Sequence, residues 1–376
     1  MKKLLGLFAL SVVAAGLLAT TGSASTSTGL NACAAKANPG SGAGLGRISG
    51  IVHAQGIASI CGAHNESDAA NGDPPLIWHG GPMMGTTSTG PLVITPIFWS
   101  PNGHNIPASY KNLIFRYLAG VAAASGSHTN VFSTLTEYSG SNGSINYNVQ
   151  VPFAVHDTGS LPASGCTVAS NDTSGTYADN SGYNACLDDD QVIAETNRVV
   201  DAFGLPRDLS HQYVLFLPKH VETCFFPGST LTSANACTIN HQPSAAYCAY
   251  HSIASNGMVY ANLSYAIYAS STGFTCGSDA RFPQVQSPNR NLDGDTEISP
   301  TSHEIMEATT DPDVATGWYD DFGFENGDEC SYVYGPVQGH SGFFFNQVIN
   351  GFKYMTQEEF SNNDFFNTGL GCLQGE

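Results

Sequence analysis

The chain has 376 residues, of which 41% are hydrophobic and 11% charged, and its formal net charge is −19. This length and apolar content are enough for a sizeable core, in one large domain or two small ones. The acidic balance argues against nucleic acid as a partner, because neutralising phosphates requires clustered lysine and arginine.

The N-terminus is typical of a secretory signal peptide. Met1-Lys2-Lys3 precedes an apolar run from Leu4 to Ala19, and small residues follow at Gly22-Ser23-Ala24. A membrane anchor would need a longer apolar stretch. We therefore expect cleavage after Ala24, with residues 1–24 as the signal peptide. The mature protein should be secreted, extracellular or periplasmic, with no transmembrane segment.

All ten cysteines follow the signal peptide, and an even count in an exported protein indicates disulfides. The absence of a C-x-x-C pair argues against a thiolate metal site. Sequence proximity suggests five pairs, although the middle four cysteines could pair otherwise. The pairs are Cys33–Cys61, Cys166–Cys186, Cys224–Cys237, Cys248–Cys276 and Cys330–Cys372.

Residues 25–75 form a low-complexity arm, which is a linker, a pro-segment or an extended segment held by its two cysteines. The globular domain is expected over residues 76–376. Apolar patterns predict strands, helices and a polar, disulfide-bearing excursion between the last two strands. The strands are 91–99, 145–155, 213–217 and 258–263, and the helices are 110–124, 131–138 and 188–203.

A further helix and a β-rich C-terminal part complete the predicted fold. A hairpin is expected from 342–348 and 351–355, turning over Ile349-Asn350. Strands that alternate with helices indicate an α/β (α+β) fold with a twisted mixed sheet, stapled by disulfides. We expect the further helix, which carries the motif described next, to pack beneath this sheet.

The motif helix should begin at Ser299-Pro300, a side-chain acceptor followed by a ring that needs no N–H. It should end near Asp311, because Pro312 disfavours helical geometry in the residue before it. His303 and Glu307 are four residues apart and share one face. Glu304 lies about a hundred degrees round the helix, on the flank of that face.

These residues form H-E-x-x-E, one residue away from the H-E-x-x-H of zinc peptidases. His303 and Glu307 are predicted to bind zinc, and Glu304 is predicted to take a proton from the attacking water as general base. The third ligand is Glu325 or Asp328, since both follow Glu307 at about the interval typical of gluzincin-type enzymes.

Structural alternatives accompany this hypothesis. Thr301 and Glu304 fit a capping box, which would make Glu304 structural. A calcium loop is a weaker possibility upstream, where oxygen ligands alternate, but a plain polar loop is the favoured reading there. That upstream group comprises Asn289, Asn291, Asp293, Asp295 and Glu297.

The sequence lacks the motifs of several other enzyme classes. There is no G-x-S-x-G nucleophile elbow, no P-loop and no dinucleotide fingerprint. Glycoside hydrolysis by a carboxylate pair stays open, because the required separation is three-dimensional.

The motif block resembles a group of secreted bacterial zincin-like proteins and is distantly similar to the phosphate-induced protein 1 (EXORDIUM) family. The block reads H-E-x-x-E, then T-D-P, G-W-Y-D and E-x-G-D-x-C, and ends at Cys330. The resemblance extends over most of the chain from Trp78, through Gly80-Gly81-Pro82 and Gln357 to Asn362. Only residues 302–330 are specific. It implies a secreted α/β domain of zincin-like character.

These observations lead to two hypotheses. The first is a secreted zinc-dependent hydrolase acting on a peptide or protein substrate. The alternative is a non-catalytic extracellular protein that binds a cell-wall polymer or another partner. In that alternative the same residues form a structural or vestigial metal site.

Overall fold

The computed structural model describes residues 49–53, 75–163, 165, 185–219, 221–224, 238, 247–266, 276, 286–313, 316–321 and 323–375. The predicted signal peptide and most of the arm lie outside these residues. Within them, no helix is both long enough and apolar enough to cross a membrane.

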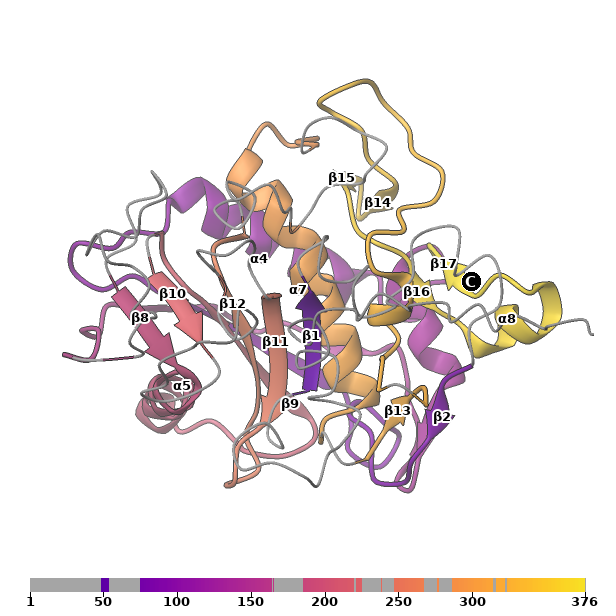
Figure 1. The fold of residues 1–376 in the computed structure, drawn as a ribbon, viewed down its shortest axis with the longest axis horizontal. Coiled ribbons are helices and arrows are strands. Elements are labelled where there is room, and N and C mark those ends of the chain that lie inside the picture. The colour runs from indigo at the N-terminus through magenta and orange to yellow at the C-terminus, as the bar shows by residue number, and fades with distance from the viewer. Residues whose placement is uncertain are drawn as a thin grey trace, which may run out of the picture.

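The central element is a mixed sheet of seven strands among the described residues (Figure 1). Strands β9, β12 and β3 run parallel to one another, whereas β11 is antiparallel to β12 and to the edge strand β1. In spatial order the strands are β1 (Ser49–His53), β11 (Tyr247–Ile253), β12 (Val259–Leu263), β9 (His211–Phe216), β3 (Leu92–Trp99) and β6 (Val149–Gln150), with β7 (Val155–Asp157) also on β3. The expected α/β class with a mixed sheet is confirmed.

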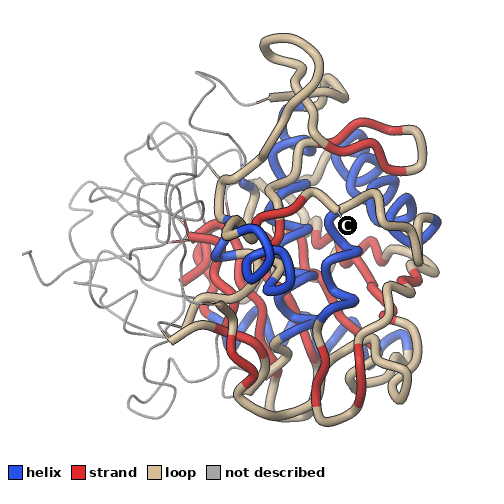
Figure 2. Tube along the Cα trace, turned by 90° about the vertical axis from the view of Figure 1, so that its right-hand side faces the viewer, coloured by secondary structure: helices blue, strands red, loops and turns tan. Residues whose placement is uncertain are grey.

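Helices cover both faces of this sheet. The long helix α7 (Leu292–Thr310) contacts β1, β11 and β12 on one face and packs against α4 (Ala108–Ala123). Helix α5 (Asp189–Phe203) covers the opposite face, against β9 and β12. The short helices are the 3-10 turns η1 (Val131–Glu137) and η3 (Asp328–Cys330) and the C-terminal α8 (Asn362–Thr368). Both α8 and the C-terminus lie at one side of the molecule (Figure 1 and Figure 2).

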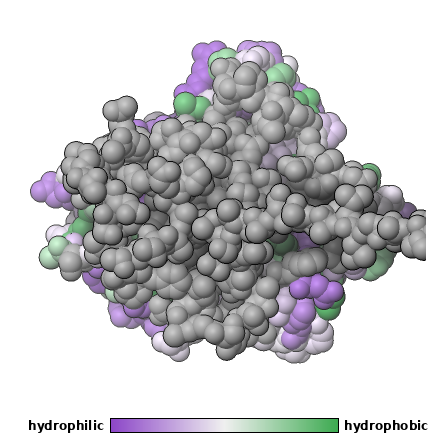
Figure 3. Space-filling view, viewed as in Figure 1, coloured by the Kyte–Doolittle hydropathy of each residue, from purple (hydrophilic) through white to green (hydrophobic). Residues whose placement is uncertain are grey.

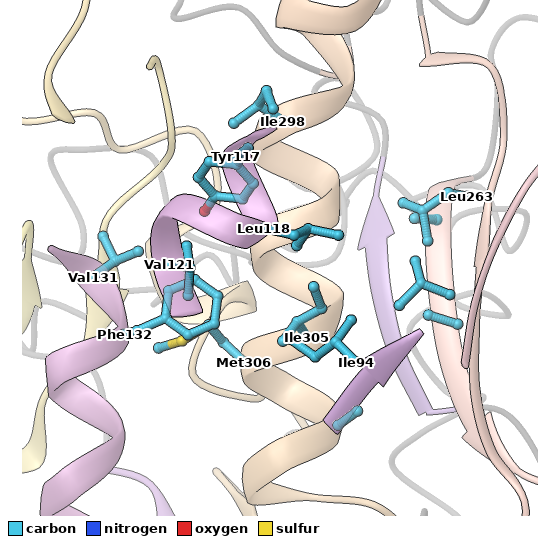
Figure 4. Packing of buried hydrophobic residues seen from close by; sticks show 14 of the residues in the cluster. Ile94, Tyr117, Leu118, Val121, Val131, Phe132, Leu263, Ile298, Ile305 and Met306 are labelled. Atoms are coloured by element: carbon cyan, nitrogen blue, oxygen red, sulfur yellow. The ribbon is translucent and has the colours of Figure 1, made fainter. Parts of the chain in front are cut away.

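Strand alternation divides the core in two. Ile94 of β3 faces the α4 and α7 side, whereas Ile97 faces the α5 side. Figure 4 shows part of the first cluster, in which Ile305 of α7 lies beside Ile94 of β3 and Met306 lies beside Phe132 of the 3-10 turn η1. Because α7 packs against the sheet and α4, its polar side chains are buried with it.

Five small strand pairs decorate this core among the described residues. They are β2 (Ile77–Trp78) with β13 (Trp318–Tyr319), β4 (Ser139–Gly140) with β5 (Gly143–Ser144), β8 (Ala185–Asp188) with β10 (Val221–Cys224), β14 (Gln347–Ile349) with β15 (Phe352–Tyr354), and β16 (Glu359–Phe360) with β17 (Cys372–Leu373). The hairpin of β14 and β15 lies in the upper part of Figure 1, and the top of the molecule carries both hydrophilic and hydrophobic residues on its surface (Figure 3).

Two predicted disulfides are confirmed, Cys248–Cys276 and Cys330–Cys372. Cys186 and Cys224 are both disulfide-bonded, with their sulfur atoms 3.5 Å apart. Their expected partners, like the predicted Cys33–Cys61 bridge, lie outside the described residues. These disulfides are consistent with an extracellular protein.

The predicted start of the motif helix is wrong. Helix α7 begins at Leu292, where the Asn291 side chain caps it by accepting from the Gly294 N–H. Pro300 therefore lies inside the helix. Ser299 does not cap; its hydroxyl accepts from the backbone N–H of Gln357. The expected capping box is wrong for the same reason, because Thr301 donates its hydroxyl to the Glu297 carbonyl in mid-helix.

Other predicted boundaries also differ. The expected strand over 145–155 is only the two short strands β6 and β7, and the hairpin turns over Asn350-Gly351, one residue later than expected. Both turn residues have positive φ, at 48° and 81°, which Asn-Gly adopts readily. Strand β1 lies within the arm for which the sequence predicts no element.

Glu297 is a buried carboxyl on α7 outside the H-E-x-x-E motif, and its protonation state can be tested. Burial raises the pKa of Glu297 from 4.5 to about 8, although its oxygen accepts from the Ala266 N–H. Between these two pKa values, the Glu297 carboxyl keeps its proton in the folded state and loses it in the unfolded chain. The contribution of the Glu297 carboxyl to stability is therefore complete below the unfolded pKa and falls as the pH rises towards 8.

We therefore predict that Glu297→Gln raises the melting temperature by on the order of a few degrees at about pH 8 and has little effect at about pH 4. Differential scanning fluorimetry at both pH values measures the difference, and Asp321→Asn, at an exposed carboxylate, serves as the control. An equal effect at both pH values would contradict the assigned protonation.

Candidate metal centre

His303 and Glu307 lie one turn apart on α7, as their spacing predicts. The His303 Nε2 is 2.9 Å from Glu307 Oε1, and both side chains are fully buried. Helix α7 ends at Thr310, close to its predicted end. The helix thus presents an imidazole and a carboxylate together towards one point.

The short helix η3 brings its first residue, Asp328, to the same point. The backbone N–H of Asp328 donates to Glu307 Oε1 at 3.0 Å, which fixes η3 against α7. The Asp328 Oδ2 accepts from the Glu325 N–H at 3.4 Å, while its Oδ1 lies 3.6 Å from His303 Nε2. The carboxylate therefore directs one oxygen towards the imidazole.

These three side chains could hold a metal ion. One ligand atom from each of His303, Glu307 and Asp328 lies within 4.8 Å of the others. Two donors each about 2.1 Å from a tetrahedral zinc are separated by roughly 3.4 Å. Nitrogen and carboxylate oxygen are donors that zinc accepts, so the donor set and its spacing fit such an ion.

A second histidine, His251, enters the centre from β11 and was not predicted. In the sheet it lies opposite Ala261, whose side chain belongs to the core on the α7 side. Its Nε2 is 2.9 Å from the carbonyl oxygen of Asp311, and its Nδ1 is 3.1 Å from Glu304 Oε2. The carbonyl can only accept, so Nε2 donates to it. The Nδ1 thus faces a carboxylate.

Strand β11 lies where the sequence suggested a polar, disulfide-bearing excursion. Its residues, Tyr-Cys-Ala-Tyr-His-Ser-Ile, include two tyrosines and an isoleucine, which favour strands. That signal could have identified the strand. The position of His251 opposite α7 depends on the register of the sheet, which local sequence does not reveal.

Glu304 and Glu325 lie on the His251 side of the centre. Ligand atoms of His251, Glu304 and Glu307 form a second group within 4.8 Å of one another. The Glu325 Oε2 is 3.7 Å from His251 Nε2. Of the two proposed third ligands, the structure groups Asp328, and not Glu325, with His303 and Glu307.

The centre favours a cation. Burial lowers the pKa of His303, but Glu307 and Asp328 outweigh this effect and hold the pKa well above its usual value. Burial also raises the pKa of nearby Glu359. The charges of Glu307 and Asp328 raise this pKa further, whereas His303 lowers it. The same carboxylates that attract a proton to His303 would attract a metal ion.

The suggested calcium loop is not supported. Residues from Leu292 onward are helical, and Asp293, Asp295 and Glu297 each have protein donors. Their partners are Lys219, Asn289 and the Ala266 N–H, respectively.

Comparisons of the chain with protein-family models, with curated proteins and with solved structures found no match. The function is therefore argued from the site itself.

Gly327 lies against the His303 ring, with no room for a larger side chain between them. Its φ of −76° suits any residue, but a Cβ there would lie 2.8 Å from both Cγ and Nδ1 of His303. We predict that Gly327→Ala displaces the imidazole and lowers zinc affinity by about tenfold or more.

Isothermal titration of metal-free protein with zinc chloride measures this loss. Gly120→Ala, in helix α4, is the matched control, because its Cβ would come no closer than 3.4 Å to its neighbours. Unchanged affinity in Gly327→Ala would remove His303 from the ligand set.

Proposed function

We propose that this protein is a secreted metal-dependent hydrolase, and specifically a zinc peptidase. The observation that carries the proposal is the convergence of His303, Glu307 and Asp328 on one point, with Glu304 adjacent on the same helix. We also propose kinship with the secreted zincin-like proteins that its motif block resembles.

In this proposal each side chain has a distinct role. His303, Glu307 and Asp328 hold the ion, which when bound lowers the pKa of water and polarises a carbonyl. Glu304 accepts the proton of the attacking water as general base. The imidazole of His251, 3.1 Å from Glu304 Oε2, orients that carboxylate. The Asp328 N–H holds Glu307 in turn.

A specific observation favours the second candidate, a non-catalytic extracellular binding protein with a structural metal. His303, Glu304 and Glu307 are all fully buried. Structural sites are closed by protein ligands, whereas catalytic sites keep a position open to substrate. Activity against peptides separates the two candidates.

We predict that Asp328→Asn and His303→Ala lower the zinc content of the purified protein and abolish peptide cleavage, because each removes a ligand. Elemental analysis and mass spectrometry of a digested synthetic peptide library measure the two effects. His340→Ala, at an exposed histidine, should retain both. Zinc binding without cleavage of any peptide would support the structural candidate instead.

Glu304→Gln separates ligand from base. The amide cannot accept the proton, so we predict that peptide cleavage falls by about 10²–10⁴-fold while zinc stays bound by the His303 group. Steady-state kinetics and elemental analysis of the same preparation test this. Full activity in Glu304→Gln would exclude Glu304 as the base.

A further inference from the structure

We infer that the centre is dinuclear: a second divalent cation binds between His251, Glu304 and Glu307, and the Glu307 carboxylate bridges the two ions. This inference rests on the proposed metal centre and deepens it. The second group contains one imidazole and two carboxylates, the same donor types as the first group.

The orientation of Glu307 is the first support. Its Oε1 lies 2.9 Å from His303 Nε2, whereas its Oε2 lies 3.8 Å from His251 Nδ1. The two oxygens of one carboxylate thus face two histidines on different elements. A carboxylate held in this way can give one oxygen to each of two ions. In two-metal sites the ions are about 3.5–4 Å apart.

The hydrogen bonding of His251 is the second support. A histidine that ligates a metal characteristically donates its other ring N–H to a carboxylate or a backbone carbonyl. His251 does so, because its Nε2 donates to the Asp311 carbonyl at the C-terminal end of α7. Its other ring nitrogen, Nδ1, faces Glu304 Oε2 at 3.1 Å, and in the neutral imidazole that nitrogen carries the lone pair that a metal ion would bind. A cation bound there would take the place of the present contact between Nδ1 and the carboxylate.

The charge of the group is the third support. His251 and His303 share the centre with Glu304, Glu307, Glu325 and Asp328, and every one of these residues is at most 2% exposed. Two imidazoles cannot balance four carboxylates, even if both are protonated. Buried charge without compensation is strongly unfavourable. Each divalent cation would offset two of these negative charges, and the nearby buried Glu359 adds a further carboxyl to the group.

A second ion changes the role of Glu304. With a second ion bound, Glu304 Oε2 would be a ligand, and the other oxygen of the same carboxylate would be left to accept the proton of the attacking water. Paired ions serve hydrolases by stabilising both the attacking and the leaving oxygen. The inference therefore points to a two-metal hydrolytic centre instead of the single zinc of the H-E-x-x-H enzymes.

The test is the zinc content of the full secreted chain after removal of metal with a chelator and reloading with zinc chloride. We expect about two zinc ions per chain in the wild type, and about one in His251→Ala and in Asp328→Asn. His211→Ala is the matched control: His211 lies at the start of β9, bonded to Asp208, and its loss should leave two. X-ray absorption of the wild type should show zinc–zinc scattering at about 3.5–4 Å.

The outcomes separate the two proposals. One zinc per chain that His251→Ala retains and Asp328→Asn loses overturns the second site and leaves the proposed hydrolase standing. Two zinc ions without zinc–zinc scattering overturn the bridge. No zinc in the wild type after reloading overturns both proposals. Because the wild-type measurements need no variant, a misfolded His251→Ala does not weaken the test.

Discussion

Carboxylates and imidazoles removed from water must be compensated inside the protein, and this requirement governs the centre of the molecule. Glu304 and Glu307 lie on a helix that is packed against the central sheet and α4, and both are fully buried. The desolvation penalty of such groups is several kcal/mol per ion even after the protein relaxes. Hydrogen bonds from backbone N–H groups offset part of it. A bound cation offsets more, and this is why the acidic centre is interpreted as a metal site.

The fold brings the ligands together from three separate segments. Helix α7 supplies the H-E-x-x-E residues, β11 supplies His251, and η3 supplies Asp328 as its first residue. The Cys330–Cys372 disulfide ties this last segment to β17, two residues beyond Asp328. The Gln357 side chain donates to the Gly327 carbonyl at 2.6 Å and holds the same segment from another direction. Ligand side chains on a backbone held in this way lose little conformational entropy when they bind an ion.

Local spacing was sufficient to predict part of this arrangement. The shared face of His303 and Glu307 follows from the helical period, and the end of the helix follows from Pro312. Ser299-Pro300 has the local chemistry of a helix start, but tertiary packing carries α7 through Pro300, and the Ser299 hydroxyl bonds to Gln357 instead. His251 reaches Glu304 only through sheet register, 53 residues away in sequence. Neither feature is encoded in a local pattern.

Anomalous diffraction at the zinc edge, from crystals of the full chain grown with zinc, would locate any zinc bound by the buried centre. We expect a peak bounded by His303 Nε2, Glu307 Oε1 and Asp328 Oδ1, the atoms that converge in the structure. A zinc peak elsewhere on the protein, with this point empty of metal, would contradict this expectation. In that case the buried carboxylates would be protonated groups of a structural core.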